Sequence, residues 1–123
     1  MLYAIFCYDN EAVTCGWSKE KDAEVMTNLG VVLDGLAKQK RLGPTARLMP
    51  TTTATTIRKG AAPVIMDGPF AETKEQLLGF YVVDCIDLEQ AIGTAKDLAK
   101  ASGSAGAFEL RPMMMFDPGG PLG

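Results

Sequence analysis

The chain has 123 residues, of which 47% are hydrophobic and 22% charged, and its formal net charge is −3. This length supports one domain with a single hydrophobic core. Its twelve Lys and Arg residues are scattered, so no basic stripe marks a surface for nucleic acid. No apolar stretch is long enough to span a membrane and no basic leader precedes the first apolar run, which favours a cytoplasmic protein.

The residue types that usually carry metal or nucleophilic chemistry are sparse. Histidine is absent, and Cys7, Cys15 and Cys85 stand far apart. Cys7 and Cys85 fall within apolar strand patterns, where a reduced thiol behaves as a small hydrophobe. Without a histidine, a cysteine pair or a spaced carboxylate cluster, we expect no metal site and no cofactor.

The first half of the chain predicts a strand, a helix and a second strand. Leu2–Tyr8 is apolar on both faces and must therefore be covered twice. After a loop carrying Trp17, Ser18 can cap a helix that Gly43 and Pro44 stop, and Thr45–Met49 is the next strand. The apolar residues of this helix recur at helical spacing: Val25, Leu29, Val32, Leu33 and Leu36.

A hairpin and a sharp turn are expected next. Thr51–Lys59 is rich in threonine and pairs with Val64–Met66. The sequence then breaks at Asp67-Gly68-Pro69, because Gly68 permits unusual backbone angles and Pro69 fixes its own φ. Thr73, followed three residues later by Gln76, fits a capping box and predicts a helix start.

The remainder predicts a strand, a helix and a final strand. Phe80–Cys85 is apolar on both faces, Asp87 caps a helix that ends at Gly103, and Ala107–Met115 is the last strand. The expected buried stripe of this helix comprises Leu88, Ala91, Ile92, Ala95, Leu98 and Ala99. We therefore expect one domain over residues 1–116 and a mobile tail over residues 117–123.

This order of elements predicts an α+β, ferredoxin-like fold: an antiparallel sheet with two helices on one face and an added β-hairpin. Two helices cover one face only. The other face, carried by Leu2 or Tyr3 and by Phe80 or Tyr81, would remain in water. We therefore expect a homodimer in which two sheets pack face to face.

The eleven residues D-G-P-F-A-E-T-K-E-Q-L at Asp67–Leu77, followed by the strand Gly79–Asp84, resemble the DGPF branch of the YCII-related family. Thr52–Arg58 and Glu109–Pro112 also fit this family. The resemblance implies a dimeric α/β barrel. DGPF-branch proteins have been associated with alternative sigma factors, which implies a regulatory or accessory role.

Some YCII-like proteins are thought to be enzymes that use a histidine on the first helix with an aspartate partner. One is a dehydrochlorinase acting on small ring-cleavage products, and the muconolactone isomerases share a similar barrel. Counting back from Asp34 places that histidine at Leu29, beside Asn28, and neither side chain can shuttle protons. A histidine-based mechanism is therefore not expected in this chain.

Two carboxylates are candidate general bases. Asp67 lies at a strand end beside the turn, and Asp9 ends the first strand. Either would need burial or a like-charged neighbour to raise its pKa toward neutrality. Asp67 could equally serve as an Asx-type cap on its own turn.

The candidate ligand-binding residues surround the same turn. If Phe108 and Leu110 face the helices, Arg111 faces the barrel interior and could clamp a carboxylate; alternatively it is solvated or pairs with Glu109. The other candidates are Gly68, Pro69, Phe70, Glu72, Thr73, Lys74 and Tyr81.

Two functions remain open from the sequence. The first is a dimeric small-molecule-binding or accessory protein whose pocket is lined by the DGPF turn, Tyr81 and Arg111. The second is a lyase or isomerase in which Asp67 or Asp9 acts as base and Arg111 orients a small organic acid. A closed pocket with a buried aspartate near Arg111 would favour the enzyme.

Overall fold

The computed structural model describes residues 1–122. In chain order its elements are β1 (Leu2–Asp9), α1 (Glu11–Thr14), α2 (Lys19–Lys38), β2 (Leu42–Arg47), the 3-10 turn η1 (Thr51–Thr53), β3 (Thr55–Arg58), β4 (Val64–Asp67), β5 (Gln76–Asp84), α3 (Leu88–Ser102) and β6 (Ala107–Pro112).

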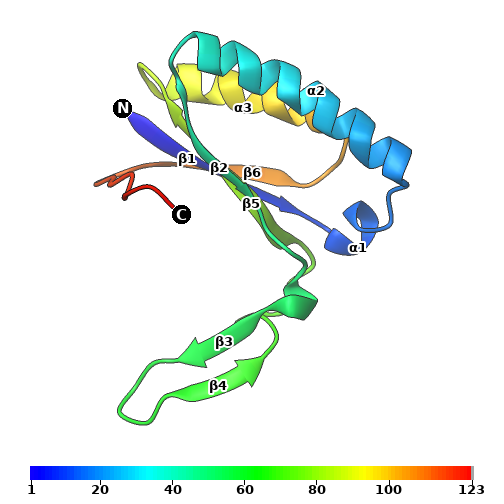
Figure 1. Cartoon of the computed structure of the whole chain (residues 1–123), viewed down its shortest axis with the longest axis vertical. Helices are drawn as coiled ribbons and strands as arrows, with labels where there is room; N and C mark the ends of the chain where they lie inside the picture. Colours follow the sequence, from blue (N-terminus) through cyan, green and yellow to red (C-terminus); the bar gives the residue numbers. More distant parts are fainter. Residues whose placement is uncertain (123) are drawn as a thin grey trace.

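Four strands form one antiparallel sheet in the order β2-β5-β1-β6. Helices α2 and α3 both lie on one face of this sheet, and the β3-β4 hairpin projects away from it (Figure 1). The predicted α+β, ferredoxin-like class with an added hairpin is therefore confirmed. The hairpin strands contact chiefly each other.

The core lies between the sheet and the two helices. Tyr3 and Ile5 of β1 and Val83 of β5 meet the predicted stripe of α2, in which Val25, Leu29 and Leu36 are buried. In α3 the buried residues are Ala91, Thr94, Ala95 and Leu98. Leu88, Ile92 and Ala99 are exposed, so their predicted burial is wrong.

Thr94 explains why the buried face of α3 differs from the predicted stripe. Its hydroxyl accepts a hydrogen bond of 2.7 Å from Arg41 Nη2 and donates to the carbonyl of Gln90. A polar residue can occupy a buried position when its hydrogen bonds are satisfied there. Hydrophobic periodicity alone does not detect such a position.

The predicted helix boundaries with clear capping chemistry are confirmed. The Ser18 side chain accepts from the Lys21 amide at 3.0 Å, and Asp87 accepts from the Gln90 amide at 2.9 Å. The Gln90 side chain in turn accepts from the Ile86 amide. Gly103 ends α3 in the left-handed conformation, with φ 62°.

The predicted helix start at Thr73 is wrong. Residues 71–75 form no helix, and Gln76 begins β5 instead. The reason is a tertiary contact, because the Gln76 side-chain oxygen accepts from the Glu11 amide at 3.0 Å while its nitrogen donates to the Thr73 carbonyl. The residue expected to complete a capping box is therefore engaged with α1.

Several other boundaries also differ from the prediction. Helix α2 ends at Lys38, and Gly43 and Pro44 lie inside β2 rather than before it. Strand β6 ends at Pro112 rather than at Met115. The short helix α1 was not predicted; Asn10 caps it by accepting from the Ala12 amide. Residues 113–122 have no helix or strand, and Gly123 lies outside the described residues.

Candidate functional site

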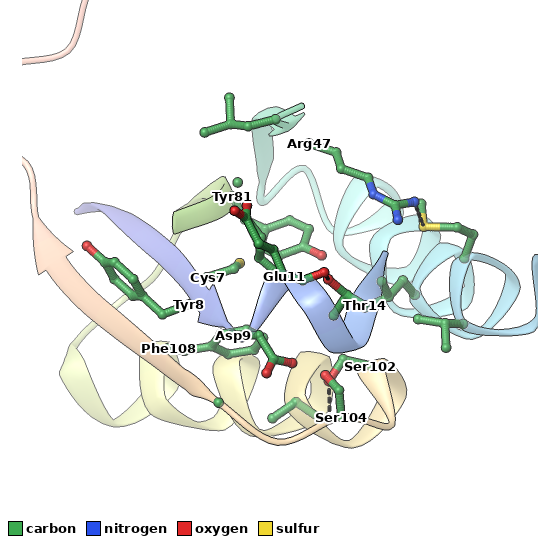
Figure 2. A pocket seen from close by; sticks show the side chains of 18 of the residues that line it. Cys7, Tyr8, Asp9, Glu11, Thr14, Arg47, Tyr81, Ser102, Ser104 and Phe108 are labelled. Carbon is green, nitrogen blue, oxygen red and sulfur yellow. Dashed lines mark hydrogen bonds between the residues drawn. The ribbon is translucent and has the colours of Figure 1, made fainter. Parts of the chain in front are cut away.

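A cavity of about 650 Å³ lies between the sheet and helices α2 and α3, at the end where β1 leads into α1 (Figure 2). Its apolar walls come from α2, α3 and the last strand, and include Val25, Leu29, Leu33, Ala95 and Phe108. Trp17, the only tryptophan of the chain, also lines it. The cavity is thus formed by residues of one chain.

Asp9 is the buried polar group of this cavity. It is the last residue of β1 and is 7% exposed. Its Oδ1 atom accepts from the Asn10 amide at 2.7 Å, whereas Oδ2 is buried and has no hydrogen-bond partner in residues 1–122. Leaving a buried carboxylate oxygen without a partner is unfavourable, so a hydrogen-bond donor on a ligand would stabilise the site.

The turn between α3 and β6 covers Asp9. Gly106 in this turn has φ 103°, and a Cβ atom added to it would lie 3.1 Å from Asp9 Cβ and Cγ. The same Cβ atom would approach the Tyr8 carbonyl oxygen to 2.2 Å. Only glycine suits this backbone angle and this close approach. The buried state of Asp9 therefore depends on Gly106.

Tyr81 of β5 and Cys7 of β1 line the sheet side of the cavity (Figure 2). Burial raises the pKa of Tyr81 to about 12, with a further contribution from Cys7. Burial also raises the pKa of the Cys7 thiol to about 12. Both groups therefore keep their protons at neutral pH, so Tyr81 can donate a hydrogen bond and Cys7 is a poor nucleophile.

An ion pair joins the two walls of the cavity at its edge. Arg47 of β2 binds Asp22 of α2 through two contacts, Nη2 to Oδ1 at 2.7 Å and Nη1 to Oδ2 at 3.3 Å. The Arg47 hydrogen bond lowers the pKa of Asp22, and the same bond raises the pKa of Arg47. The guanidinium is thus already engaged by a carboxylate of the protein.

Glu11, at another edge of the cavity, forms hydrogen bonds with the residues at the base of the β3-β4 hairpin. Its carboxylate accepts from the Thr51 amide at 3.0 Å and from the Thr51 hydroxyl. Its own amide donates to Gln76. Thr51 lies just before β3 and Gln76 begins β5, so Glu11 holds both segments that lead into and out of the hairpin.

The structure brings together two of the residues predicted for the site, Asp9 and Tyr81. Asp67 is exposed at the end of β4. Among the residues described, the cavity lining includes neither Asp67 nor any of the remaining residues predicted from the turn: Gly68, Pro69, Phe70, Glu72, Thr73 and Lys74. A pocket shaped by the DGPF turn is therefore not the cavity observed.

Arg111 also lies apart from the cavity. Phe108 and Leu110 pack against the core, as predicted, and Arg111 is exposed between Leu110 and Pro112 on β6. Strand alternation puts Arg111 on the sheet face away from the helices. The buried aspartate and this arginine thus lie on opposite faces.

Three residues of the site were not predicted from the sequence: Arg47, Asp22 and Gly106. Arg47 and Asp22 belong to separate elements, and no local pattern links them. Gly106 follows Gly103 by three residues in a short loop, which is a weak turn signal. These residues belong to the site because of contacts with residues that are distant in the sequence.

Two further findings concern the described part of the chain. Within residues 1–122, His, Cys, Asp and Glu side chains form no group of three or more that could hold a metal ion. Over the same range, none of the helices combines the length and apolar character needed to cross a membrane.

Comparison with known proteins places the chain in a family. The family model for the YCII-related domain matches residues 1–117. An uncharacterized protein of Rhizobium meliloti (strain 1021) is 52% identical over 120 residues, which cover 97% of each chain. A solved structure, 5-chloro-2-hydroxyhydroquinone dehydrochlorinase from Burkholderia phenoliruptrix AC1100 in complex with 2,5-dihydroxybenzoquinone, is 12% identical and covers 92% of this chain and 93% of its own, with a TM-score of 0.49. This chain belongs to the YCII-related family.

Proposed function

We propose that this protein binds a small, largely apolar organic molecule in the cavity between the sheet and helices α2 and α3. The observation that carries the proposal is Asp9, which belongs to the lining of a cavity of about 650 Å³ and whose buried Oδ2 atom lacks a partner in residues 1–122. Ligand pockets typically enclose about 300–1,000 Å³ and combine apolar walls with a few polar groups.

The polar groups of the cavity would orient such a molecule. Asp9 offers an acceptor and the protonated Tyr81 phenol offers a donor, on neighbouring strands of one sheet. The walls from α2 and α3 would cover the apolar body of the ligand. Binding would satisfy Asp9 Oδ2, for which the described residues supply no donor.

A fluorescence titration tests this proposal. The neutral apolar probe N-phenyl-1-naphthylamine should bind and quench Trp17, because that side chain lines the cavity. Leu33→Phe, which adds volume inside the cavity, should weaken binding at least fivefold. The matched variant Val31→Phe changes a residue of α2 that is 70% exposed and should leave binding unchanged. Equal binding by both variants and the wild type would rule out the cavity as the site.

A second candidate function is a lyase or isomerase in which Asp9 acts as general base. It is favoured by the same unpartnered oxygen, which could accept a proton from a bound ligand, while Tyr81, opposite Ile5 on the next strand, could donate a hydrogen bond to another part of that ligand. The two functions differ in what happens to the bound ligand. A binding protein returns its ligand unchanged, whereas the enzyme would exchange a ligand C–H proton for deuterium in D2O, and Asp9→Asn would abolish that exchange.

We further infer that the protein is a homodimer. Phe6 and Phe80 are cross-strand partners on the sheet face away from the helices, where they are only partly buried. The β3-β4 hairpin also exposes Ile57 by 60% and Ile65 by 71%, directly opposite each other. A two-stranded hairpin is marginally stable unless its apolar residues pack against something.

The location of the exposed apolar side chains, on the hairpin and on the open sheet face, supports a second copy as the partner. The exposed apolar side chains of the hairpin and the turn after it are Ile57, Val64, Ile65, Met66 and Phe70. They amount to an area on the order of 300 Å², taking about 100 Å² for a fully exposed side chain of this size. Each partner contributes roughly 800 Å² to a standard interface, so the open sheet face would have to supply the remainder. Two copies related by a two-fold axis would cover both surfaces at once.

A further inference from the structure

We infer that the ligand of the cavity is a cation: a compact apolar molecule whose protonated amine pairs with Asp9. This inference rests on the proposed binding function and narrows it to one chemical class. It replaces the small organic acid that the sequence had suggested.

Asp9 has no counter-charge among residues 1–122. The ion pairs of residues 1–122 are the N-terminal amine with Asp84 and Arg47 with Asp22. No Lys or Arg nitrogen of the described chain thus lies within 4.0 Å of Asp9. A buried carboxylate without a cation is strongly unfavourable, because the interior solvates it far less well than water does.

The other charged groups of the cavity do not compensate for the charge of Asp9. Arg47 is engaged by Asp22, and the Glu11 carboxylate is engaged by Thr51. Lys96 of α3 is exposed, and among residues 1–122 its amine forms no ion pair with Asp9. The charged side chains of the lining are Asp9, Glu11, Asp22, Arg47 and Lys96, in which carboxylates outnumber cations.

Within the described part of the chain, Asp9 lacks both a hydrogen-bond donor for Oδ2 and a positive charge beside its carboxylate. A hydroxyl group would supply the missing donor but no charge, and a carboxylate would add a second negative charge beside Asp9. An ammonium group supplies donor and positive charge together, in a charge-assisted hydrogen bond that is about twice as strong as a neutral one. The aromatic side chains Trp17, Tyr81 and Phe108 would pack on the apolar body of such an amine.

Isothermal calorimetry with three probes of nearly equal size tests this inference: benzylamine, benzyl alcohol and benzoate. On the wild type we expect benzylamine to bind at least tenfold more tightly than benzyl alcohol, and benzoate to bind most weakly. The advantage of benzylamine over benzyl alcohol should fall below twofold in Asp9→Asn. The matched variant Asp97→Asn, on the exposed side of α3, should keep the advantage.

The possible failures are distinguishable. If benzyl alcohol or benzoate binds as tightly as benzylamine while N-phenyl-1-naphthylamine still binds the cavity, the cationic class is wrong and the binding function stands. If neither the amine nor the fluorescent probe binds, the binding function fails as well. The comparison of probes on the wild type needs no variant, so it holds even if Asp9→Asn does not fold. Benzylamine bound equally well by a folded Asp9→Asn would also overturn the pairing with Asp9.

Discussion

Gly106 lies directly against Asp9, so that a Cβ atom on this glycine would stand 3.1 Å from the Cβ and Cγ atoms of the aspartate. The two residues come from opposite ends of the chain, one at the end of β1 and the other just before β6. Antiparallel pairing of these strands brings them together. The site thus depends on a loop that closes over the end of the first strand.

Replacing Gly106 with alanine should destabilise the protein. The substitution combines φ 103° with a contact of 2.2 Å to the Tyr8 carbonyl, and strained backbone of this kind costs about 1–3 kcal/mol. We expect the free energy of unfolding, measured with urea, to fall by at least about 2 kcal/mol. Gly93→Ala is the matched control, since its Cβ would meet nothing within 4 Å in α3; it should be neutral or stabilising by up to about 1 kcal/mol. An unchanged midpoint for Gly106→Ala would contradict this close contact.

Stability should decrease at alkaline pH. The ordinary pKa values of a cysteine thiol and a tyrosine phenol are 9.0 and 10.0, and those of Cys7 and Tyr81 each rise to about 12 in the folded protein. Between these values the folded state holds protons that the unfolded state has released, so stability is full below pH 9 and is lost as pH approaches 12.

Urea midpoints measured across this range test the expectation. Tyr81→Phe and Cys7→Ala should each flatten the alkaline decline, whereas replacing the exposed Cys15 with alanine should not. A decline of equal slope in all three variants would show that other groups cause it.

Glu11 should restrain the root of the hairpin. Because its carboxylate accepts from the Thr51 amide and from the Thr51 hydroxyl, Glu11→Ala removes two hydrogen bonds at the junction of the hairpin with the cavity edge. A charge-assisted bond of this kind contributes about 1.5–3 kcal/mol, so amide hydrogen exchange at Thr51 should accelerate at least tenfold. Glu20→Ala, in the first turn of α2, should leave that rate unchanged. Equal exchange rates at Thr51 in the two variants would mean that Glu11 does not hold the hairpin.

The apolar hairpin should contribute to dimerisation. Ile65 is 71% exposed in the single chain, so Ile65→Lys should barely change the stability of the subunit but should introduce a charge into the interface. Sedimentation at low micromolar concentration should show a dimer for the wild type and a monomer for this variant. Val31→Lys, at a comparably exposed position of α2, should remain a dimer. A monomeric wild type would refute the proposed dimer itself.

The sequence predicted the elements whose signals are local. Ser18 and Asp87 cap helices through their own side chains, and the β3-β4 hairpin follows from β-branched residues on both sides of a glycine turn. The helix start expected at Thr73 failed because Gln76 instead bonds to Glu11, far away in the sequence. Local patterns cannot reveal such competition.

The site was predictable only in part. Asp9 and Tyr81 could be selected because each lies on an apolar strand, where a polar group is informative. The turn at Asp67 carries a denser group of polar residues, yet the hairpin holds it away from the sheet. Burial of Asp9 depends on Gly106, and the ion pair of Arg47 depends on Asp22. In each case the two residues are far apart in the sequence and meet only in the folded chain.

A crystal structure of the protein with benzylamine would test the central claim most directly. The account predicts the ring among Trp17, Leu29 and Phe108, with the amine nitrogen about 2.8 Å from Asp9 Oδ2. An empty cavity with benzylamine bound elsewhere, or an Asp9 Oδ2 atom that makes no contact with the bound amine, would contradict it.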